Sequence, residues 1–158
     1  MSKATPATRF LGQKKISFEV LEYDYAPEAG KIGMQAAESL AMNPSKVLKT
    51  LMIEVDTKPA CVVIPSDRTL SMKKVAAAFD GKSAAMMAPD KAERLTGFRT
   101  GGISPFGQKK RVSICFEISA IGDHPVAING GRRGLMVRMD ARQALAAAGA
   151  TACPLTAD

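Results

Sequence analysis

One stretch of the chain is too rich in glycine and proline to form a regular helix or strand: Gly101-Gly102-Ile103-Ser104-Pro105-Phe106-Gly107-Gln108-Lys109-Lys110-Arg111. Three glycines, a proline and a serine fall within seven residues there, a composition typical of a tight loop. Because glycine lacks a Cβ atom, the backbone N–H groups of such a loop can approach a ligand closely. The basic triplet that ends the stretch makes an anion or a polyanion the ligand to expect.

Short helices and short strands are predicted to alternate along the rest of the chain. Apolar periodicity, capping residues, prolines and glycines predict helices over residues 5–13, 34–42, 71–79, 89–96 and 141–148. Apolar runs bounded by turn residues predict strands over residues 16–23, 47–55, 60–65, 83–87, 112–116, 125–128 and 135–138. Residues 27–33 are predicted to form a loop. Elements mixed so irregularly favour one α+β domain over residues 1–158, with short helices around a curved, barrel-like mixed sheet. A chain of 158 residues can bury its core without disulfides or metals.

Charge and cysteine content bound the function further. The formal net charge of +7 favours an acidic partner such as nucleic acid, although a generically soluble basic protein would show the same balance. Cys61, Cys115 and Cys153 form no closely spaced pair, and the apolar runs around the first two predict buried thiols. Unpaired cysteines are typical of the reducing cytosol. Residues 1–8 lack the apolar core of a secretory signal and no run is long enough to span a membrane, so a cytoplasmic location is expected.

The sequence lacks the residue patterns of most metal- and cofactor-dependent sites. Its single histidine, His124, is flanked by Asp123 and Pro125, which is typical of a turn. Clustered metal ligands and a GxSxG serine are both missing, so neither a zinc site nor a Ser-His-Asp triad is expected. No Walker loop or GxGxxG motif is present. We therefore expect no cofactor and no metal, and either chemistry that needs neither or binding alone.

A lone lysine interrupts one apolar strand, Val47-Leu48-Lys49-Thr50-Leu51-Met52-Ile53. Side chains alternate between the two faces of a strand, so Lys49 shares a face with Val47 and Leu51. If that face is buried, Lys49 must contact an anion or lose its charge. If the face is exposed, Lys49 is an ordinary surface residue. The residues alone leave both alternatives open.

Four motifs resemble the YbaK family, which comprises free-standing relatives of the editing domain of bacterial prolyl-tRNA synthetases. Residues 101–110 resemble its signature GGISPLGQKK, and residues 47–51 resemble its V-x-K-T-L. Residues 129–135, N-G-G-R-R-G-L, resemble its S-G-G-K-R-G-L. Lys15-Ile16-Ser17-Phe18 and Tyr23 match in the same order. The resemblance covers nearly the whole chain, and its GGISP loop is highly specific.

This resemblance implies an editing-domain fold and the removal of wrongly attached amino acids from tRNA. YbaK-type members act mainly on cysteinyl-tRNA(Pro), where the substrate's own thiol attacks its ester carbonyl, so the reaction is classed as a lyase as well as a hydrolase. The implied partners are the acceptor end of aminoacyl-tRNA and prolyl-tRNA synthetase. Two alternatives stay open: a deacylase for a different small amino acid, and a non-catalytic module that binds tRNA or a synthetase.

The resemblance assigns the main functional role to Lys49 and the aminoacyl end to the loop from Gly101 to Pro105. An aminoacyl ester is already activated, so its cleavage needs positioning and hydrogen-bond donors for the developing oxyanion rather than a protein nucleophile. The backbone N–H groups of Gly101, Gly102 and Ile103 suit that task. The residues expected to bind the substrate are Tyr23, Ile32, Thr50, Ser104, Pro105, Asn129, Gly130 and Met136. Contacts with tRNA phosphates are expected for Lys109, Lys110, Arg111, Arg132 and Arg133. The alternative is that these side chains form an ordinary solvated surface.

Three positions near the expected amino-acid pocket depart from the family pattern. Ile32 aligns with a phenylalanine, Asn129 replaces a serine and Met136 replaces an aspartate, whereas Phe106 for leucine is a mild change. We expect the fold and the deacylase class to survive these changes. An adaptable apolar pocket should accept small thiol or aliphatic side chains better than charged ones, so cysteine specificity is less firmly implied.

Overall fold

Strand β2 (Val47–Val55) is the central element of one mixed sheet that contains eight strands in the described residues. The computed structural model describes residues 4–25 and 32–158, the side chains of residues 32 and 33 excepted. The strand order is β1-β7-β6-β2-β3-β5-β8, with β4 also paired to β2. The other strands are β1 (Glu19–Glu22), β3 (Lys58–Pro65), β4 (Ala84–Met86), β5 (Ser113–Glu117), β6 (Pro125–Arg132), β7 (Leu135–Asp140) and β8 (Thr151–Cys153). The expected α+β class with a mixed sheet is confirmed, and β1 and β8 form open edges.

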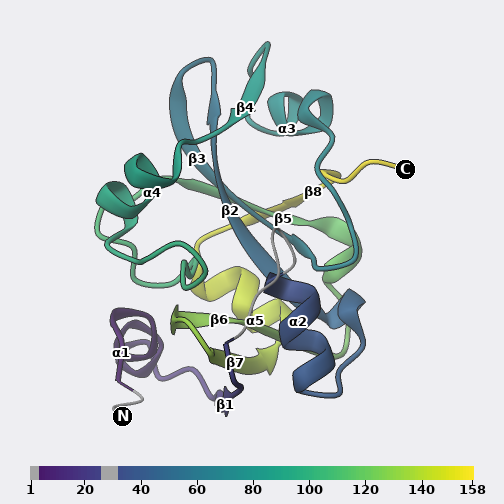
Figure 1. Ribbon diagram of the computed structural model, residues 1–158. Helices are drawn as coiled ribbons and strands as arrows, with labels where there is room; N and C mark the ends of the chain where they lie inside the picture. Colours follow the sequence, from purple (N-terminus) through teal and green to yellow (C-terminus); the bar gives the residue numbers. More distant parts are fainter. Residues whose placement is uncertain (1–3, 26–31) are drawn as a thin grey trace.

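Short helices surround this sheet (Figure 1). Thr5, Ser71 and Asp140 cap three of them through side-chain oxygens that accept backbone N–H groups, and Gly97, with φ +80°, ends a fourth. These caps explain why the helices begin and end close to the predicted positions. The helices are α1 (Pro6–Gln13), α2 (Ile32–Ser39), α3 (Met72–Ala78), α4 (Pro89–Thr96) and α5 (Ala141–Ala147), with 3₁₀ turns at Pro44–Lys46 and Ile118–Ala120.

Strand β2 has a continuous partner on one side and an interrupted one on the other. It pairs with β3 from Leu48 to Val55. On its other side β6 pairs with Val47 and Leu48, while β4 pairs only with Ile53 to Val55. Among the described residues, no strand covers positions 49–51 on that side. The sheet therefore contains a gap beside the middle of β2.

The Gly-rich loop is anchored to the main core below this gap. Phe106 is completely buried, and its ring stacks on Phe10 of α1 with centroids 6.5 Å apart. Gly107, with φ +71°, lies so close to α1 that a Cβ atom would come 2.6 Å from the Pro6 carbonyl oxygen. In Figure 1, α1 and α2 lie at the lower end of the molecule, and α4 with the loop after it lies on the left.

Several bounds differ from the sequence-based expectation: β1 begins at Glu19 rather than at residue 16, and β6 continues to Arg132 instead of ending at residue 128. Of the loop expected over 27–33, residues 27–31 lie outside the described residues. Residues 32 and 33, expected to lie in a loop, form the first turn of α2, which ends at Ser39 rather than at residue 42. Strand β8 was not expected, because its three residues owe their extended form to parallel pairing with β5 rather than to a local pattern. None of the helices in the described ranges is long and apolar enough to cross a membrane.

Candidate functional site

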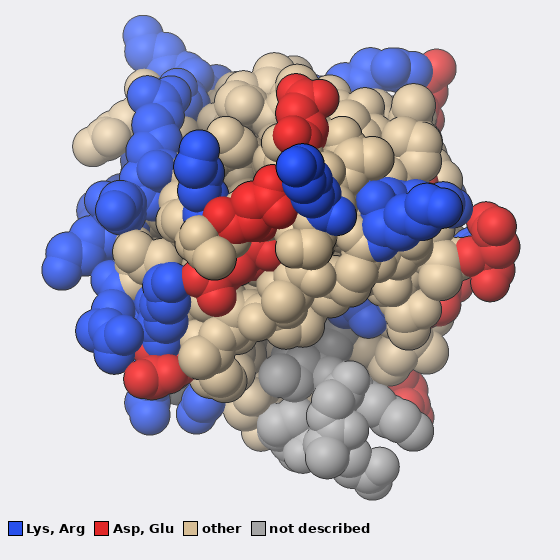
Figure 2. Space-filling view, turned by 90° about the horizontal axis from the view of Figure 1, so that it is seen from above, with Lys and Arg blue, Asp and Glu red and all other residues tan. Residues whose placement is uncertain are grey.

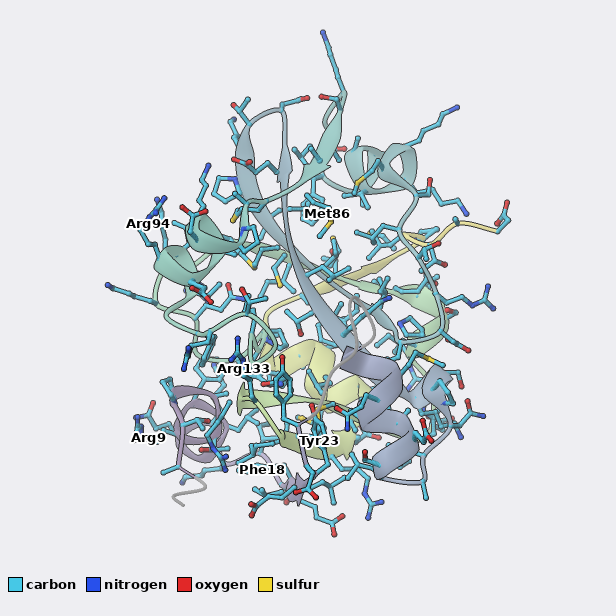
Figure 3. All side chains as sticks on the ribbon, in the orientation of Figure 1. Arg9, Phe18, Tyr23, Met86, Arg94 and Arg133 are labelled. Carbon is cyan, nitrogen blue, oxygen red and sulfur yellow. The ribbon has the colours of Figure 1, made fainter. Side chains whose placement is uncertain are left out.

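A cavity of about 300 Å³ opens at the gap beside β2. Five consecutive residues of that strand, from Leu48 to Met52, line it. Tyr23 follows β1, and Figure 3 shows it low in the molecule, with Met86, the last residue of β4, well above it. The remaining walls come from α2, the residue after β3, β4, the start of α4, the Gly-rich loop and the β6–β7 hairpin, through Met34, Ala36, Ser66, Met86, Met87, Pro89, Ala92, Thr100, Gly101, Ile103, Asn129 and Met136. Segments far apart in the sequence thus meet at one concave site.

Methionine supplies much of the apolar wall. Met34, Met52, Met86, Met87 and Met136 all line the cavity. Met34 and Met86 are 40% and 50% exposed, although large apolar side chains are mostly buried elsewhere in the described chain. Methionine is unbranched and polarizable, so such a wall adapts to different apolar side chains. The cavity is therefore suited to an apolar group of variable shape.

Lys49 is the one charged side chain among the described residues that line the cavity. It is half-buried, which corresponds to the inward alternative for this strand. Burial lowers the pKa of the Lys49 ammonium, and the nearby negative charge of Asp67 partly opposes this effect. A partly desolvated ammonium in an apolar cavity attracts an anion or a developing negative charge strongly.

Three hydroxyl groups at the cavity lack a protein partner of normal geometry. They are the Oη atom of Tyr23 and the Oγ1 atoms of Thr50 and Thr100, all buried and without a hydrogen bond within the described part of the chain. Burial raises the pKa of Tyr23, while the neighbouring Gly134 N–H lowers it to a smaller extent. A buried polar atom without a partner costs about 1–3 kcal/mol, and three of them at one cavity are the pattern that a ligand-binding site would leave open.

The β6–β7 hairpin holds the Gly-rich loop by two carbonyl groups. Arg133 donates from Nε to the Thr100 carbonyl at 2.8 Å, and Asn129 donates from Nδ2 to the Gly101 carbonyl at 3.1 Å. The Thr100 N–H donates to the Glu93 carboxylate at 2.7 Å, and this bond lowers the pKa of Glu93. In a planar trans peptide the N–H points opposite to the C=O. The Gly101 N–H is therefore directed away from Arg133 and has no partner in the described chain.

Two glycines of the loop are required by close contacts. Gly101 has φ +89°, and a Cβ atom there would come 2.3 Å from the Tyr25 hydroxyl oxygen. A Cβ atom on Gly102 would come 2.9 Å from the backbone nitrogen of Arg133. The Gly102 N–H already donates to the Arg99 carbonyl at 2.8 Å. Of the three expected oxyanion donors, the N–H groups of Gly101 and Ile103 are those left without a partner in the described residues.

Several expected substrate-binding residues lie beside the cavity rather than in its wall. Ser104 is completely buried, and its Oγ accepts the Phe106 N–H at 3.2 Å. Pro105 is buried in the same turn, and Gly130 packs so tightly that a Cβ atom would come 2.2 Å from Leu135. The side chain of Ile32 lies outside the described residues. By contrast Tyr23, Thr50, Asn129 and Met136 do line the cavity.

Basic side chains gather on the side of α4. Figure 2 shows Lys and Arg along its left edge, the side on which α1 and α4 lie in Figure 1. The Lys109 and Lys110 N–H groups bind carbonyls of Thr96 and Leu95 at the end of α4. This arrangement brings the exposed triplet close to two arginines that the sequence did not single out. We call the set the basic edge: Arg94, Arg99, Lys109, Lys110 and Arg111, all exposed.

Arg132 and Arg133 differ from the basic edge, because both are partly buried. The Nε and Nη2 atoms of Arg132 are inaccessible and have no partner in the described chain. The guanidinium of Arg133 lies over the ring of Tyr25, 5.3 Å from its centroid, and binds the Gly-rich loop. Arg133 thus holds the loop from the hairpin, beside the cavity rather than in its wall.

The described residues hold no group of three or more His, Cys, Asp and Glu side chains placed to bind a metal. Cys61 and Cys115 are buried as expected, and burial raises the pKa of Cys61 to about 12. Sequence reasoning missed Thr100, the methionine wall and Arg99. Thr100 and Arg99 directly precede Gly101, so the loop motif extended by two residues would have included them.

Comparisons with known proteins match this architecture. A family model described as the aminoacyl-tRNA editing domain matches residues 26–146. EbsC of Enterococcus faecalis, named as a candidate Cys-tRNA(Pro)/Cys-tRNA(Cys) deacylase, is 30% identical over 137 residues, which cover 85% of this chain and 82% of that protein. The proline–tRNA ligase of Geobacillus thermodenitrificans is 28% identical over 98 residues, 61% of this chain but 16% of the ligase.

Solved structures show the same fold. A candidate trans-editing enzyme for prolyl-tRNA synthetase superposes with a TM-score of 0.82 at 20% identity, covering 99% of this chain and all of that one. Protein APE2540 superposes with a TM-score of 0.86 at 19% identity, covering 97% of this chain and all of that one. With the family model spanning most of the sequence, including the cavity-lining residues of β2, the Gly-rich loop and the hairpin, the chain belongs to the aminoacyl-tRNA editing domain family.

Proposed function

We propose that the protein is a deacylase that acts in trans on wrongly charged tRNA, with cysteinyl-tRNA(Pro) as its main substrate. The observation that carries this proposal is the composition of the cavity. It combines one partly buried ammonium, unpartnered hydroxyls and free backbone N–H groups with an adaptable apolar wall. Family membership and the candidate deacylase among the relatives support the same activity.

The cavity has donors for an oxyanion, but its described lining contains no cysteine or histidine, and the Ser66 hydroxyl there already donates to the Val47 carbonyl. The cysteine thiols of the protein do not line it, and the buried Cys61 holds its proton tightly, with a pKa of about 12. In the proposed reaction the cysteine sulfur of the substrate forms a bond to its own carbonyl carbon. The bond between that carbon and the ribose oxygen breaks, and the thiol proton passes to the ribose oxygen. The product is a cyclic thioester that water then opens.

The protein contributes position and charge to this reaction. The N–H groups of Gly101 and Ile103 are available to the carbonyl oxygen as it becomes negative. The Lys49 ammonium stabilises the same negative charge or holds the terminal phosphate of the tRNA. The cavity wall keeps the cysteinyl group bent, so that its sulfur approaches its own carbonyl.

The basic edge provides a surface for the acceptor stem. It lies directly before and after the loop that lines the cavity, since Arg99 precedes Thr100 and Lys109 follows Gln108. Exposed arginines and lysines bind phosphates without reading sequence. Binding of different tRNAs through this surface, followed by selection at the cavity, fits an enzyme that edits in trans.

The methionine wall favours a second candidate substrate within the same class, a small aliphatic aminoacyl ester such as alanyl-tRNA. Met136 stands where the family has an aspartate, and five methionines meet at the cavity. One apolar pocket separates side chains that differ by a methylene by only about 1–3 kcal/mol. We therefore expect weaker cleavage of other small esters and little cleavage of aspartyl- or lysyl-tRNA.

Single-turnover deacylation of a panel of charged tRNAs tests this function. We expect the fastest cleavage for cysteinyl-tRNA(Pro) and much slower cleavage when the cysteine is S-methylated. Equal rates for the two would exclude the substrate thiol as nucleophile and favour an activated water instead. No cleavage of any member, with retained tRNA binding, would favour the non-catalytic module.

A further inference from the structure

The middle of β2 exposes a backbone edge to the cavity. In an antiparallel ladder, alternate residues direct both their N–H and C=O groups to the same neighbouring strand. Val47 accepts the Ser66 N–H at 2.9 Å, so the odd-numbered residues face β3. Met52 accepts the Met87 N–H at 3.2 Å and Asp56 donates to Ser83 at 2.9 Å, so the even-numbered residues face the other side. Thr50 therefore directs its peptide groups into the gap.

Neither peptide group of Thr50 has a partner there. The ladder with β6 stops at Leu48 and the ladder with β4 starts at Ile53. Neither ladder therefore supplies a bond to the Thr50 N–H or C=O in the described chain. The prolines of β3 agree with this register, because Pro65 and Pro59 lie opposite the even-numbered residues Leu48 and Glu54, where no N–H is needed.

Strand backbone without a partner is rare beside a cavity that is largely apolar. At Thr50 the N–H and the C=O have no strand partner on this side within the described residues, the buried Oγ1 has no hydrogen bond there, and the residue lines the cavity. The N–H donor and the C=O acceptor belong to the same residue. Together they match the acceptor and donor that one residue of an antiparallel strand would present.

We propose that Thr50 is the subsite for the main-chain atoms of the aminoacyl group. This inference rests on the proposed deacylase function. An α-amino acid esterified to tRNA carries an amine donor and a carbonyl acceptor on adjacent carbons. It pairs with Thr50 as one strand residue would: the amine donates to the Thr50 carbonyl, and the Thr50 N–H donates to the ester carbonyl oxygen. That donation also stabilises the negative charge that develops on this oxygen.

Such a subsite separates two tasks. The edge at Thr50 recognises any α-amino ester, because its contacts involve no side chain of the substrate. Choice between amino acids is then made by the methionine wall, and Gly101 and Ile103 approach the same ester from the loop. The protein should therefore discriminate against acyl groups that lack an α-amine, even when their side chains fit.

Matched substrates test the subsite directly. Wild-type protein is given cysteinyl-tRNA(Pro) and 3-mercaptopropionyl-tRNA(Pro), which keeps the thiol but lacks the amine, and alanyl-tRNA(Pro) beside propionyl-tRNA(Pro). For each ester we compare the acceleration over its own uncatalysed hydrolysis. We expect the acceleration to be at least about tenfold smaller for the amine-free ester of each pair. Equal acceleration of both members of each pair would overturn the subsite while leaving the deacylase function intact. Failure to cleave either aminoacyl ester would refute the deacylase function itself, and the subsite with it.

A pair of variants tests the N–H from the protein side. Thr50→Pro removes this N–H without removing a bond to β3, whereas Thr50→Val removes only the hydroxyl. We expect Thr50→Pro to lose at least about tenfold more activity than Thr50→Val. Equal activity of two folded variants would exclude the N–H contact. If Thr50→Pro does not fold, the substrate pairs decide the question alone.

Discussion

Two regions of the molecule bury polar groups in opposite ways. At the C-terminal segment the carboxylate of Glu117, which is 4% exposed, accepts hydrogen bonds from the Ser119, Leu155 and Thr156 N–H groups and from the Thr156 hydroxyl. At the cavity the Thr50 hydroxyl has no partner in the described chain, and the Thr50 peptide groups face a gap that no described strand fills. The hydrogen bonds of the Glu117 carboxylate are satisfied within the protein, whereas the groups at the cavity keep open the hydrogen bonds that a ligand-binding site would need.

The largest expected effect comes from removing the charge of the cavity. Lys49→Ala should lower the single-turnover rate about 10²–10³-fold, the loss typical of removing one group that stabilises an oxyanion. Its control is Lys58→Ala, an exposed lysine on the same hairpin, which should keep the wild-type rate. A folded Lys49→Ala variant within a few-fold of wild type would remove Lys49 from the mechanism.

The next effect concerns the shape of the Gly-rich loop. Gly101→Val places side-chain atoms where the Tyr25 hydroxyl lies and demands a strained positive φ, so we expect a loss of about 10²-fold through misplacement of the ester. Ser104→Ala should be much milder, because Ser104 is buried in the turn and does not line the cavity. An inactive, folded Ser104→Ala beside an active Gly101→Val would reverse these roles and make the hydroxyl central.

A smaller effect should distinguish loop positioning from phosphate binding at Arg133. Arg133→Lys keeps the charge but loses the Nε donor that holds the Thr100 carbonyl. We expect about tenfold slower cleavage of both aminoacyl-tRNA and a small aminoacyl ester, with unchanged tRNA affinity. Wild-type cleavage rates for Arg133→Lys on both substrates would show that only the positive charge matters. That result would favour the phosphate contact expected from the sequence.

The basic edge should affect binding and leave the chemistry unchanged. Neutralising Lys109, Lys110 and Arg111 should weaken tRNA binding and flatten its salt dependence by about one unit of slope for each lost phosphate contact. Cleavage of a small aminoacyl ester should stay at the wild-type rate. Unchanged tRNA affinity at low salt would show that these three residues form an ordinary solvated surface and do not bind tRNA phosphates.

Much of this architecture is visible in the sequence because it is local. Helix caps at Thr5, Ser71 and Asp140 and the left-handed Gly97 are short-range signals, and each marks a helix end in the structure. The Gly-rich loop is equally local, since its composition alone excludes regular structure. Strand β8 escaped prediction because pairing with β5, not its own residues, makes it extended.

The cavity could not be predicted in the same way. It exists because β6 and β4, nearly forty residues apart in sequence, cover different ends of one side of β2 and leave Thr50 uncovered between them. No local pattern encodes such a gap. The unpartnered edge at Thr50 is a consequence of this gap. The role of Arg133 in holding the loop depends on a tertiary contact of the hairpin. Neither feature can be recognised without the three-dimensional structure.

The contrast between the two regions is tested most directly by measuring stability and kcat/KM together for Glu117→Gln and Thr50→Val. Burial alone would raise the pKa of the Glu117 carboxyl. The hydrogen bonds that it accepts outweigh this effect, so the pKa lies below its ordinary value. Its stabilisation is therefore present above the ordinary carboxyl pKa of about 4.3 and is lost as the pH falls through the folded-state value. We expect Glu117→Gln to lose about 1–3 kcal/mol at neutral pH, less in acid, with kcat/KM unchanged. Thr50→Val should keep full stability and lose about tenfold in kcat/KM. A destabilised Thr50→Val with wild-type kcat/KM would contradict a cavity whose open hydrogen bonds await a substrate.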